Sequence, residues 1–237
     1  FYDDEKYFRK GRGRTPPPDP GPERELNSRL YFPGLSARPW WSASALPLAR
    51  GLASRFSMIR EEGVRLLSRP WLFAAHPGAR GHGRGGGTGS LRGTWLAYYL
   101  QRYFQRIPLA AEHAPVAQRS LDGAPLSREV MFSFLSPGAE IGPHSDGVNF
   151  VVTIYLPLFS SPGAWIRFGH EARTWSDGVC FAADSTYYHT SVNDSPWWRG
   201  LLIVDLWHPE LTSVERDVLA EAVPRVDALL RGRQGLS

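Results

Sequence analysis

The chain contains a single cysteine, Cys180, among its 237 residues. One thiol excludes an intramolecular disulfide and a zinc site built from cysteines, and it is compatible with a reducing compartment without requiring one. No apolar run reaches the roughly eighteen residues that a membrane-spanning helix needs, so we expect membrane attachment only through a segment outside this chain. The chain begins with Phe1, so we read it as a fragment or a processed form.

Lysine is also scarce, because only Lys6 and Lys10 occur and arginine supplies nearly all of the 27 positive side chains. The formal net charge is +4 and the pI is about 9.4. This excess is too small to indicate nucleic-acid binding, so we expect no nucleic-acid partner. Hydrophobic residues make up 42% of the chain, which suits one sizeable β domain with helices, or at most two small domains.

The organisation of the N-terminal third follows from its composition. Residues 1–30 contain the run GRGRTPPPDPGP, which predicts an extended, low-complexity Pro/Arg-rich linker that packs poorly. We assign residues 31–237 to a single domain, in which apolar residues at helical spacing predict a helix over 44–68. Residues 76–93 are rich in Gly and Arg. Their GHGRGG run matches a dinucleotide fingerprint only weakly, since no strand precedes it, so we interpret a loop, with an RNA-binding segment as the alternative.

From about residue 94 to 210 the sequence consists of short segments rich in β-branched and aromatic residues. Pro, Gly, Asp and Ser separate these segments, so they predict a mainly β core, either a sandwich or a barrel of the jelly-roll type. A helix should follow over 212–231, because Thr212 and Glu215 have capping-box spacing. Pro224 should kink or interrupt that helix.

The run PHSDGVN carries the candidate metal ligands. In an extended segment, residues two apart project to the same side, so His144 and Asp146 converge while Ser145 turns away. Gly147 then allows the chain to turn. His189 follows 45 residues after His144. Two histidines and one carboxylate on one face of a metal leave positions open for a cosubstrate and O2, which suits Fe(II) oxygen chemistry, although H-x-D alone is common by chance.

Arg199 opens a strongly apolar segment, RGLLIVDLW. An arginine that points inward there needs an anion, because an unpaired buried charge is very costly. The carboxylate of 2-oxoglutarate would accept its forked donors. An ion pair with Asp205 or another acid is the alternative, and the residues themselves favour neither reading.

The C-terminal two thirds of the chain resembles the aspartyl/asparaginyl β-hydroxylase family of Fe(II) and 2-oxoglutarate-dependent oxygenases. The matching stretches are YFPGLSARPWW (31–41), IREEG (59–63), TWLAYYLQ (94–101), FSFLSPG (132–138), PHSDGVN (143–149), EARTWSDG (171–178), DSTYYH (184–189) and RGLLIVDLWHPELT (199–212). The resemblance implies a double-stranded β-helix, a jelly-roll and cupin-like core, with flanking N-terminal and C-terminal helices.

The resemblance also assigns roles to residues of this chain. His144, Asp146 and His189 match the iron ligands, so the facial triad is complete, although some family members lack the carboxylate. Arg199 and Ser133 match residues that bind the distal carboxylate of 2-oxoglutarate, and Trp95 matches a substrate-side tryptophan.

The strand after the motif departs from the family, because Val151, Thr153 and Tyr155 stand where members carry cationic or imidazole groups. Tyr155 can still hold one oxygen of 2-oxoglutarate, and Thr153 faces the substrate. We therefore expect a target less anionic than aspartate.

The expected function is hydroxylation of a peptidyl side chain in a protein or peptide, or of a small molecule, with O2 as the oxidant. A catalytically silent family member that serves as a binding module is one alternative, and a zinc hydrolase with the same ligands is another.

The compartment stays open: the resemblance suggests the lumenal part of an endoplasmic-reticulum membrane protein, and the cytoplasm is the other reading. We expect His208 to make a structural hydrogen bond and Asp184 to stabilise a turn, with support of the metal ligands from behind as the alternative for Asp184. The remaining histidines have no second ligand at useful spacing.

Overall fold

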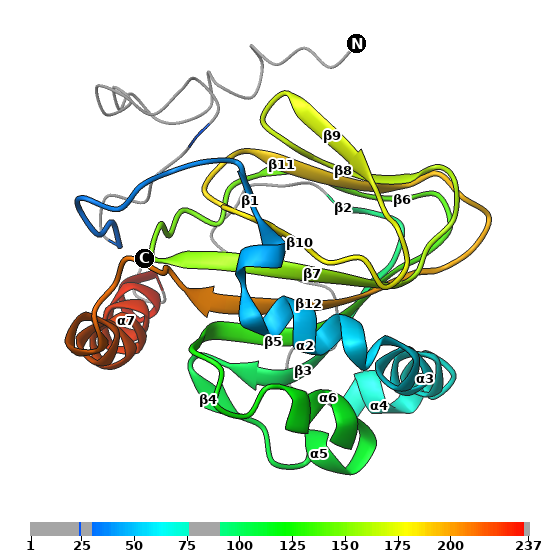
Figure 1. Ribbon diagram of the computed structural model, residues 1–237, viewed down its shortest axis with the longest axis horizontal. Coiled ribbons are helices and arrows are strands. Elements are labelled where there is room, and N and C mark those ends of the chain that lie inside the picture. The colour runs from blue at the N-terminus through cyan, green and yellow to red at the C-terminus, as the bar shows by residue number, and fades with distance from the viewer. Residues whose placement is uncertain (1–23, 25–29, 76–90, 235–237) are drawn as a thin grey trace.

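Two antiparallel β-sheets face each other in the computed structural model, which describes residue 24, residues 30–75 and residues 91–234. The larger sheet has seven strands in the order β1-β10-β7-β12-β5-β3-β4, and the smaller has five in the order β2-β6-β11-β8-β9. Helices α2 to α6 cover the outer side of the larger sheet, as Figure 1 shows. The chain is therefore mainly β, as the sequence predicts.

The elements have the following bounds. The strands are β1 (Trp40–Trp41), β2 (Leu91–Arg92), β3 (Trp95–Arg102), β4 (Gln105–Arg106), β5 (Leu126–Leu135), β6 (Ala139–His144), β7 (Val151–Phe159), β8 (Ala164–Phe168), β9 (Glu171–Thr174), β10 (Phe181–Ala183), β11 (His189–Asn193) and β12 (Arg199–Trp207). The helices are η1 (Ala43–Ala45), α2 (Pro47–Ser54), α3 (Phe56–Leu67), α4 (Pro70–Ala75), α5 (Ala110–His113), α6 (Pro115–Ser120) and α7 (Ser213–Gln234).

The path of the chain from β5 to β12 makes a double-stranded β-helix. It crosses from β5 to β6, returns to β7, crosses to β8 and β9, and then repeats the crossing through β10, β11 and β12. The last two strands insert between earlier ones, β11 between β6 and β8, and β12 between β5 and β7. The expected fold class is confirmed.

Strand β12 shows how the two faces of the larger sheet differ. Successive side chains of a strand point to opposite faces. Leu202 and Val204 accordingly lie in the core beneath the helices, whereas Leu201 packs with Ile166 and Phe168 of β8 between the sheets. Arg199 has the same parity as Leu201, so its side chain leaves the strand on the interior face between the two sheets.

The predicted single helix over 44–68 is wrong in its continuity. The segment forms η1, α2 and α3, with Arg55 between α2 and α3 in a non-helical conformation (φ −108°, ψ 12°). Pro47 opens α2, and the residue before a proline is kept out of the helical region, so Leu46 is extended. The apolar stripe itself is correct, because Leu52 and Ile59 are fully buried.

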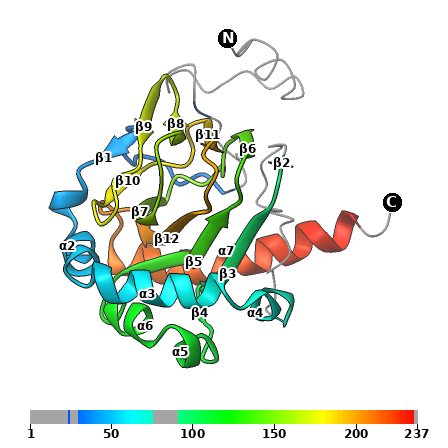
Figure 2. The same cartoon turned by 90° about the vertical axis from the view of Figure 1, so that its right-hand side faces the viewer.

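The C-terminal helix is present as α7, and it projects past the sheets in Figure 2. The capping box forms as predicted, because the Thr212 amide donates to a Glu215 carboxylate oxygen at 2.8 Å and the Glu215 amide donates to the Thr212 hydroxyl at 3.3 Å. The predicted interruption at Pro224 is wrong, since the helix continues through it. No helix in the described part of the chain has the length and apolar character needed to cross a membrane.

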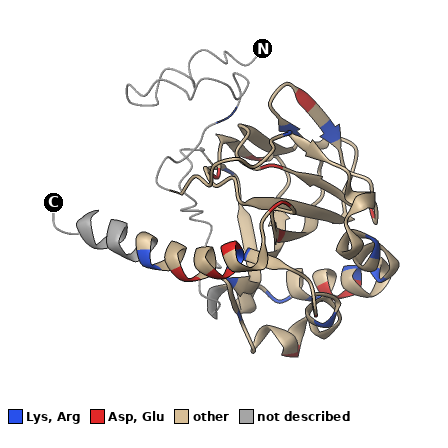
Figure 3. Ribbon diagram, turned by 60° about the vertical axis from the view of Figure 1, so that its left-hand side comes forward, with Lys and Arg blue, Asp and Glu red and all other residues tan. Residues whose placement is uncertain are grey.

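Charged residues, blue and red in Figure 3, lie mostly on the helices and on the β8–β9 hairpin, whereas the ribbon of the two-sheet core is largely tan. The few charges on the interior face are therefore informative. Most of the predicted Gly/Arg-rich loop lies outside the described residues; only its last part is described, where residues 91 and 92 form β2.

Candidate metal centre

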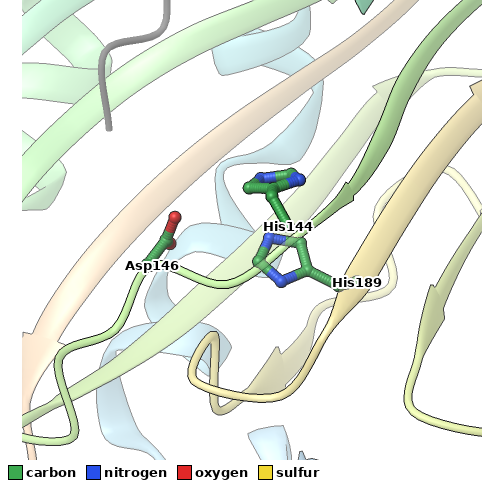
Figure 4. Close-up of side chains that lie close together, drawn as sticks. All are labelled: His144, Asp146 and His189. Atoms are coloured by element: carbon green, nitrogen blue, oxygen red, sulfur yellow. The ribbon is translucent and has the colours of Figure 1, made fainter. Parts of the chain in front are cut away.

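Three side chains that are distant in sequence meet at one end of the smaller sheet. His144 ends β6 and His189 begins β11, and the two residues are direct partners in the antiparallel register. Asp146 lies on the loop that continues from His144 (Figure 4). One possible ligand atom from each of the three lies within 4.8 Å of the others. The structure thus brings together all three predicted ligands of the facial triad.

Backbone carbonyls fix the orientation of both imidazoles. Nδ1 of His144 lies 2.8 Å from the carbonyl oxygen of Gly142, and Nδ1 of His189 lies 2.9 Å from that of Tyr187. A carbonyl can only accept, so Nδ1 carries a proton in both rings, and Nε2 is the ring nitrogen left to face a metal. Burial, together with the nearby His144, lowers the pKa of His189 to about 4. The ring is therefore neutral near pH 7, the state that a ligand requires.

Asp146 is held on the loop by contacts to the segment that precedes His189. Its amide donates to the carbonyl of Ser185 at 2.9 Å, and Gly147 after it has a φ of 71°. That conformation favours glycine, as the sequence predicts for this turn. Burial opposes ionisation of Asp146, but His189, His144 and Arg128 outweigh it, and its pKa is lowered. The carboxylate is thus ionised and available to a cation.

Arg199 is the most unusual charged residue of the interior. It is 2% exposed, and its Nε and Nη2 atoms have no hydrogen-bond partner among the described residues. Its guanidinium carbon lies 5.5 Å from the ring centroid of Trp175, and burial lowers its pKa to about 9. The alternative ion pair with Asp205 does not form in the described part of the chain, since Asp205 instead accepts a hydrogen bond from Thr153 at 2.9 Å.

The other predicted site residues lie on strands of the larger sheet. Ser133 pairs in register with Leu201, so it shares the interior face with Arg199, and its hydroxyl accepts a hydrogen bond from Trp95 Nε1 at 2.9 Å. Tyr155 and Thr153 are buried on β7, and Tyr155 acts electrostatically on Arg199. Each of these residues can reach the interior between the two sheets.

Sequence reasoning missed three charged or aromatic residues near the triad and Arg199, which are Arg128, Glu129 and Trp175. Arg128 acts electrostatically on Asp146, Glu129 and Asp205, so its guanidinium lies near all three carboxylates. Trp175 lies beneath Arg199. The Arg-Glu pair at 128 and 129, at the edge of the apolar run VMFSFL, was the available signal.

Two further predictions are confirmed. His208 makes a structural hydrogen bond, with Nε2 3.1 Å from the carbonyl oxygen of Ser36. Asp184 stabilises a turn, because its carboxylate accepts from the amide of Thr186 at 2.9 Å. Among the remaining histidines that the structure describes, none belongs to the triad. His113 and His170 are described and lie elsewhere, while positions 76 and 82 fall outside the described residues.

The profile of the family described as "Aspartyl/Asparaginyl beta-hydroxylase" matches residues 53–209, about two thirds of the chain. The chain belongs to the aspartyl/asparaginyl β-hydroxylase family. The human protein named "Aspartyl/asparaginyl beta-hydroxylase" is 28% identical over 195 residues, which are 77% of this chain and 24% of that protein. The human "Aspartate beta-hydroxylase domain-containing protein 2" is 29% identical over 138 residues, covering 54% of this chain and 37% of the relative.

This member of the β-hydroxylase family therefore spans only about a quarter to a third of the length of those relatives. Among solved structures, a "Cupin 2 conserved barrel domain protein" from Salinispora arenicola is 16% identical with a TM-score of 0.34, covering 56% of this chain and 89% of that one. The fold assignment rests on the strand order itself.

Proposed function

We propose that this domain is an Fe(II)- and 2-oxoglutarate-dependent oxygenase that hydroxylates a side chain of a protein or peptide. Family membership and the His-Asp-His group support a metal-dependent hydroxylase. Iron as the metal, 2-oxoglutarate as cosubstrate and O2 as oxidant are the further steps of the proposal.

The observation that carries the proposal is Arg199, whose Nε and Nη2 have no partner among the described residues and which lies on the interior face that the triad adjoins. A fully desolvated guanidinium with two unused donors is very costly unless an anion arrives. A dicarboxylate that reaches from a metal to an arginine meets both requirements, because one end can chelate and the other can accept two parallel hydrogen bonds. Ser133 lies diagonally across from Arg199 on the same face and can donate its hydroxyl proton to the same carboxylate.

The donor set fits the implied metal. Two imidazole Nε2 atoms and one carboxylate on one side leave the remaining positions open, the arrangement of non-haem Fe(II) oxygenases. When bound, iron and 2-oxoglutarate would supply the activation of O2 and the removal of hydrogen from a substrate carbon. The chain itself positions these groups: His144 and His189 are held in one tautomer by carbonyls, and Asp146 is kept ionised.

The alternatives use fewer of these features. A zinc hydrolase needs the three ligands but gives Arg199 no purpose. A silent binding module needs neither the open triad nor an unpaired buried cation. Arg199 therefore favours the oxygenase over both.

The substrate face supports a target less anionic than aspartate. Val151 and Thr153 offer no positive charge, and a neutral hydrogen bond contributes roughly 0.5–1.5 kcal/mol, against about 1.5–3 for one to a charged group. An acidic side chain placed beside them would lack a fixed counter-charge from β7.

The direct test is turnover. The chain loaded anaerobically with Fe(II) should bind 2-oxoglutarate, and on exposure to O2 it should form succinate slowly without substrate and faster with an accepted peptide, which gains one oxygen in mass. Matched peptides with Asp, Asn or a neutral residue at the target position rank the specificity. Absence of 2-oxoglutarate binding at any concentration tried would leave the binding module as the better reading, and hydrolysis with zinc alone would favour the hydrolase. If the Asp peptide has the highest kcat/KM, the substrate preference is wrong while the oxygenase assignment stands.

A further inference from the structure

The turn at residues 184–187 contacts the metal centre through three consecutive carbonyls. The Ser185 carbonyl accepts the Asp146 amide at 2.9 Å, and the Thr186 carbonyl accepts the Ser145 hydroxyl at 2.8 Å. The Tyr187 carbonyl lies 2.9 Å from Nδ1 of His189. One short turn thus positions the carboxylate ligand, the residue before it and one imidazole.

Ser145 connects the turn to the residues on both sides of Asp146. Its hydroxyl also accepts a hydrogen bond from the amide of Gly147 at 3.1 Å, so the segment around Asp146 is tied on both sides to the turn. Ser145 is 5% exposed and Thr186 is fully buried. A displacement of the turn would therefore move Asp146 and His189 together.

The conformation of the turn depends on Asp184. One carboxylate oxygen of Asp184 accepts from both the amide and the hydroxyl of Thr186. The Asp184 amide donates to the carbonyl of Pro39 at 3.2 Å, and its own carbonyl accepts the Tyr187 amide at 3.2 Å. Burial raises the pKa of Asp184, and Arg24 is the largest opposing influence. Without a cation beside it, this carboxylate would be a buried, uncompensated charge.

The cation comes from the N-terminal segment. Arg24 Nη2 lies 3.2 Å from the second Asp184 oxygen, and the two side chains are only 5% and 3% exposed. Its Nε donates to the Thr186 hydroxyl, and its guanidinium carbon lies 5.5 Å from the centroid of the Tyr187 ring. The backbone of Arg24 also forms an antiparallel bridge with Tyr187. Arg24 lies within the stretch expected to pack poorly, yet its side chain is buried against the turn.

We infer that Arg24 is a positioning residue of the metal centre, acting through Asp184 and the 184–187 turn on Asp146 and His189. The inference rests on the proposed metal site and extends it to a residue outside the span matched by the family profile, residues 53–209. Arg24 is then part of the centre rather than of a passive linker. Partners that orient ligands from behind commonly alter metal affinity by about ten- to a hundredfold when removed.

The test measures Co(II) binding to the full chain, followed by visible absorption, whose band positions report ligand geometry. Arg24→Ala should weaken Co(II) affinity about ten- to a hundredfold and shift the bands. Arg24→Lys should recover part of the affinity, because an ammonium can pair with Asp184 but cannot reach Thr186 in the same fork. Arg92→Ala is the matched control, since Arg92 pairs with Glu140 of β6 at 3.4 Å with its own side chain 65% exposed, and it should leave both readouts unchanged.

A double variant separates positioning from simple loss of stability. Arg24→Ala with Asp184→Asn removes the buried charge as well as its partner, so it should bind Co(II) better than Arg24→Ala alone. If Arg24→Ala does not fold, the graded comparison of Arg24→Lys with Thr186→Val replaces it. Wild-type affinity and bands in a folded Arg24→Ala, or in both replacement variants, overturn the inference alone. Failure of the wild-type chain to bind Co(II) overturns the proposed metal centre with it.

Discussion

Replacing Arg199 with methionine should separate the two things that a buried guanidinium does. Methionine has no charge, and it fills the space of the aliphatic stem of the arginine without placing a polar group beside Trp175. In the protein without cosubstrate, Nε and Nη2 of Arg199 have no partner among the described residues, and leaving such donors unsatisfied costs about 1–3 kcal/mol. We therefore expect Arg199→Met to unfold at higher urea concentration than wild type in the absence of 2-oxoglutarate.

The same substitution should weaken 2-oxoglutarate binding. Losing a charge-assisted pair in a desolvated site costs roughly 2–5 kcal/mol, which corresponds to about one and a half to three and a half decades in Kd. Metal binding should be retained, because the triad is formed by other strands. Arg199→Lys should bind 2-oxoglutarate with an affinity between those of wild type and Arg199→Met, since lysine keeps the charge but loses the planar fork.

The assay is calorimetric titration of 2-oxoglutarate into Mn(II)-loaded protein without oxygen, paired with urea unfolding of the metal-free protein. Arg60→Met is a matched control, because Arg60 is an arginine whose Nε donates to the Leu158 carbonyl at 3.0 Å away from the site. It should lose stability and keep cosubstrate affinity. If Arg199→Met shows that same pattern, Arg199 is structural and the cosubstrate site has been misplaced.

Three further outcomes are expected. His144→Ala and His189→Ala should abolish Mn(II) binding in equilibrium dialysis, with Asp146→Ala less severe, and wild-type affinity in either histidine variant would remove the site. Burial raises the pKa of Asp205 to about 7 from 3.8, so the folded metal-free protein keeps a proton that the unfolded chain releases. The contribution of protonated Asp205 to the free energy of unfolding is therefore complete below about pH 4 and is lost as the pH rises to about 7. Asp205→Asn should make the free energy of unfolding in urea vary less with pH across that range. The same pH dependence in the variant and in wild type would contradict this assignment. Glu62→Gln should lower the free energy of unfolding by about 1–3 kcal/mol without altering metal affinity, because Glu62 accepts two backbone amides at 2.7 and 2.9 Å beneath α6; a drop in metal affinity would argue against a purely structural role.

The fold was predictable in class because its strands carry their own local signal. Alternating β-branched and aromatic residues identify segments such as β7 and β12, yet both are nearly wholly buried, and local pattern does not say which strands pair. The strand order was expected from family resemblance. The N-terminal helix was predicted in its apolar face and wrong in its continuity, because Pro47 and Arg55 interrupt a stripe whose spacing continues across them.

The residues of the site also differ in how far the sequence predicts their positions. His144 and Asp146 are two residues apart, so local geometry predicts that they converge. His189 joins them only through the register of β11 on β6, which the spacing of residues cannot reveal. The contribution of Arg24 was not predictable either, since its ion pair with Asp184 joins residues 160 positions apart.

The surroundings of Arg128 bear on the substrate. The pairing of β5 shifts register against both neighbouring strands, between Val204 and Leu206 of β12 and between Tyr99 and Gln101 of β3. No alternation rule says which way a side chain points across such a break, so sequence reasoning did not count Arg128 as a cation of the interior. Its charge lies near Asp146, Glu129 and Asp205, and Glu129 lies 3.9 Å from a second arginine, Arg102.

An arginine that already interacts electrostatically with Asp146 and Glu129 is a poor receptor for another carboxylate. To bind an acidic target, Arg128 would have to exchange existing favourable interactions for equivalent ones, while the approaching carboxylate lost its hydration. A metal bound to Asp146 would still leave Glu129 as a competitor. Thr153 adds no cation and already donates to Asp205. The charges near the triad thus favour a substrate group that is neutral or donates hydrogen bonds, for the same reason that the cation-poor strand β7 does.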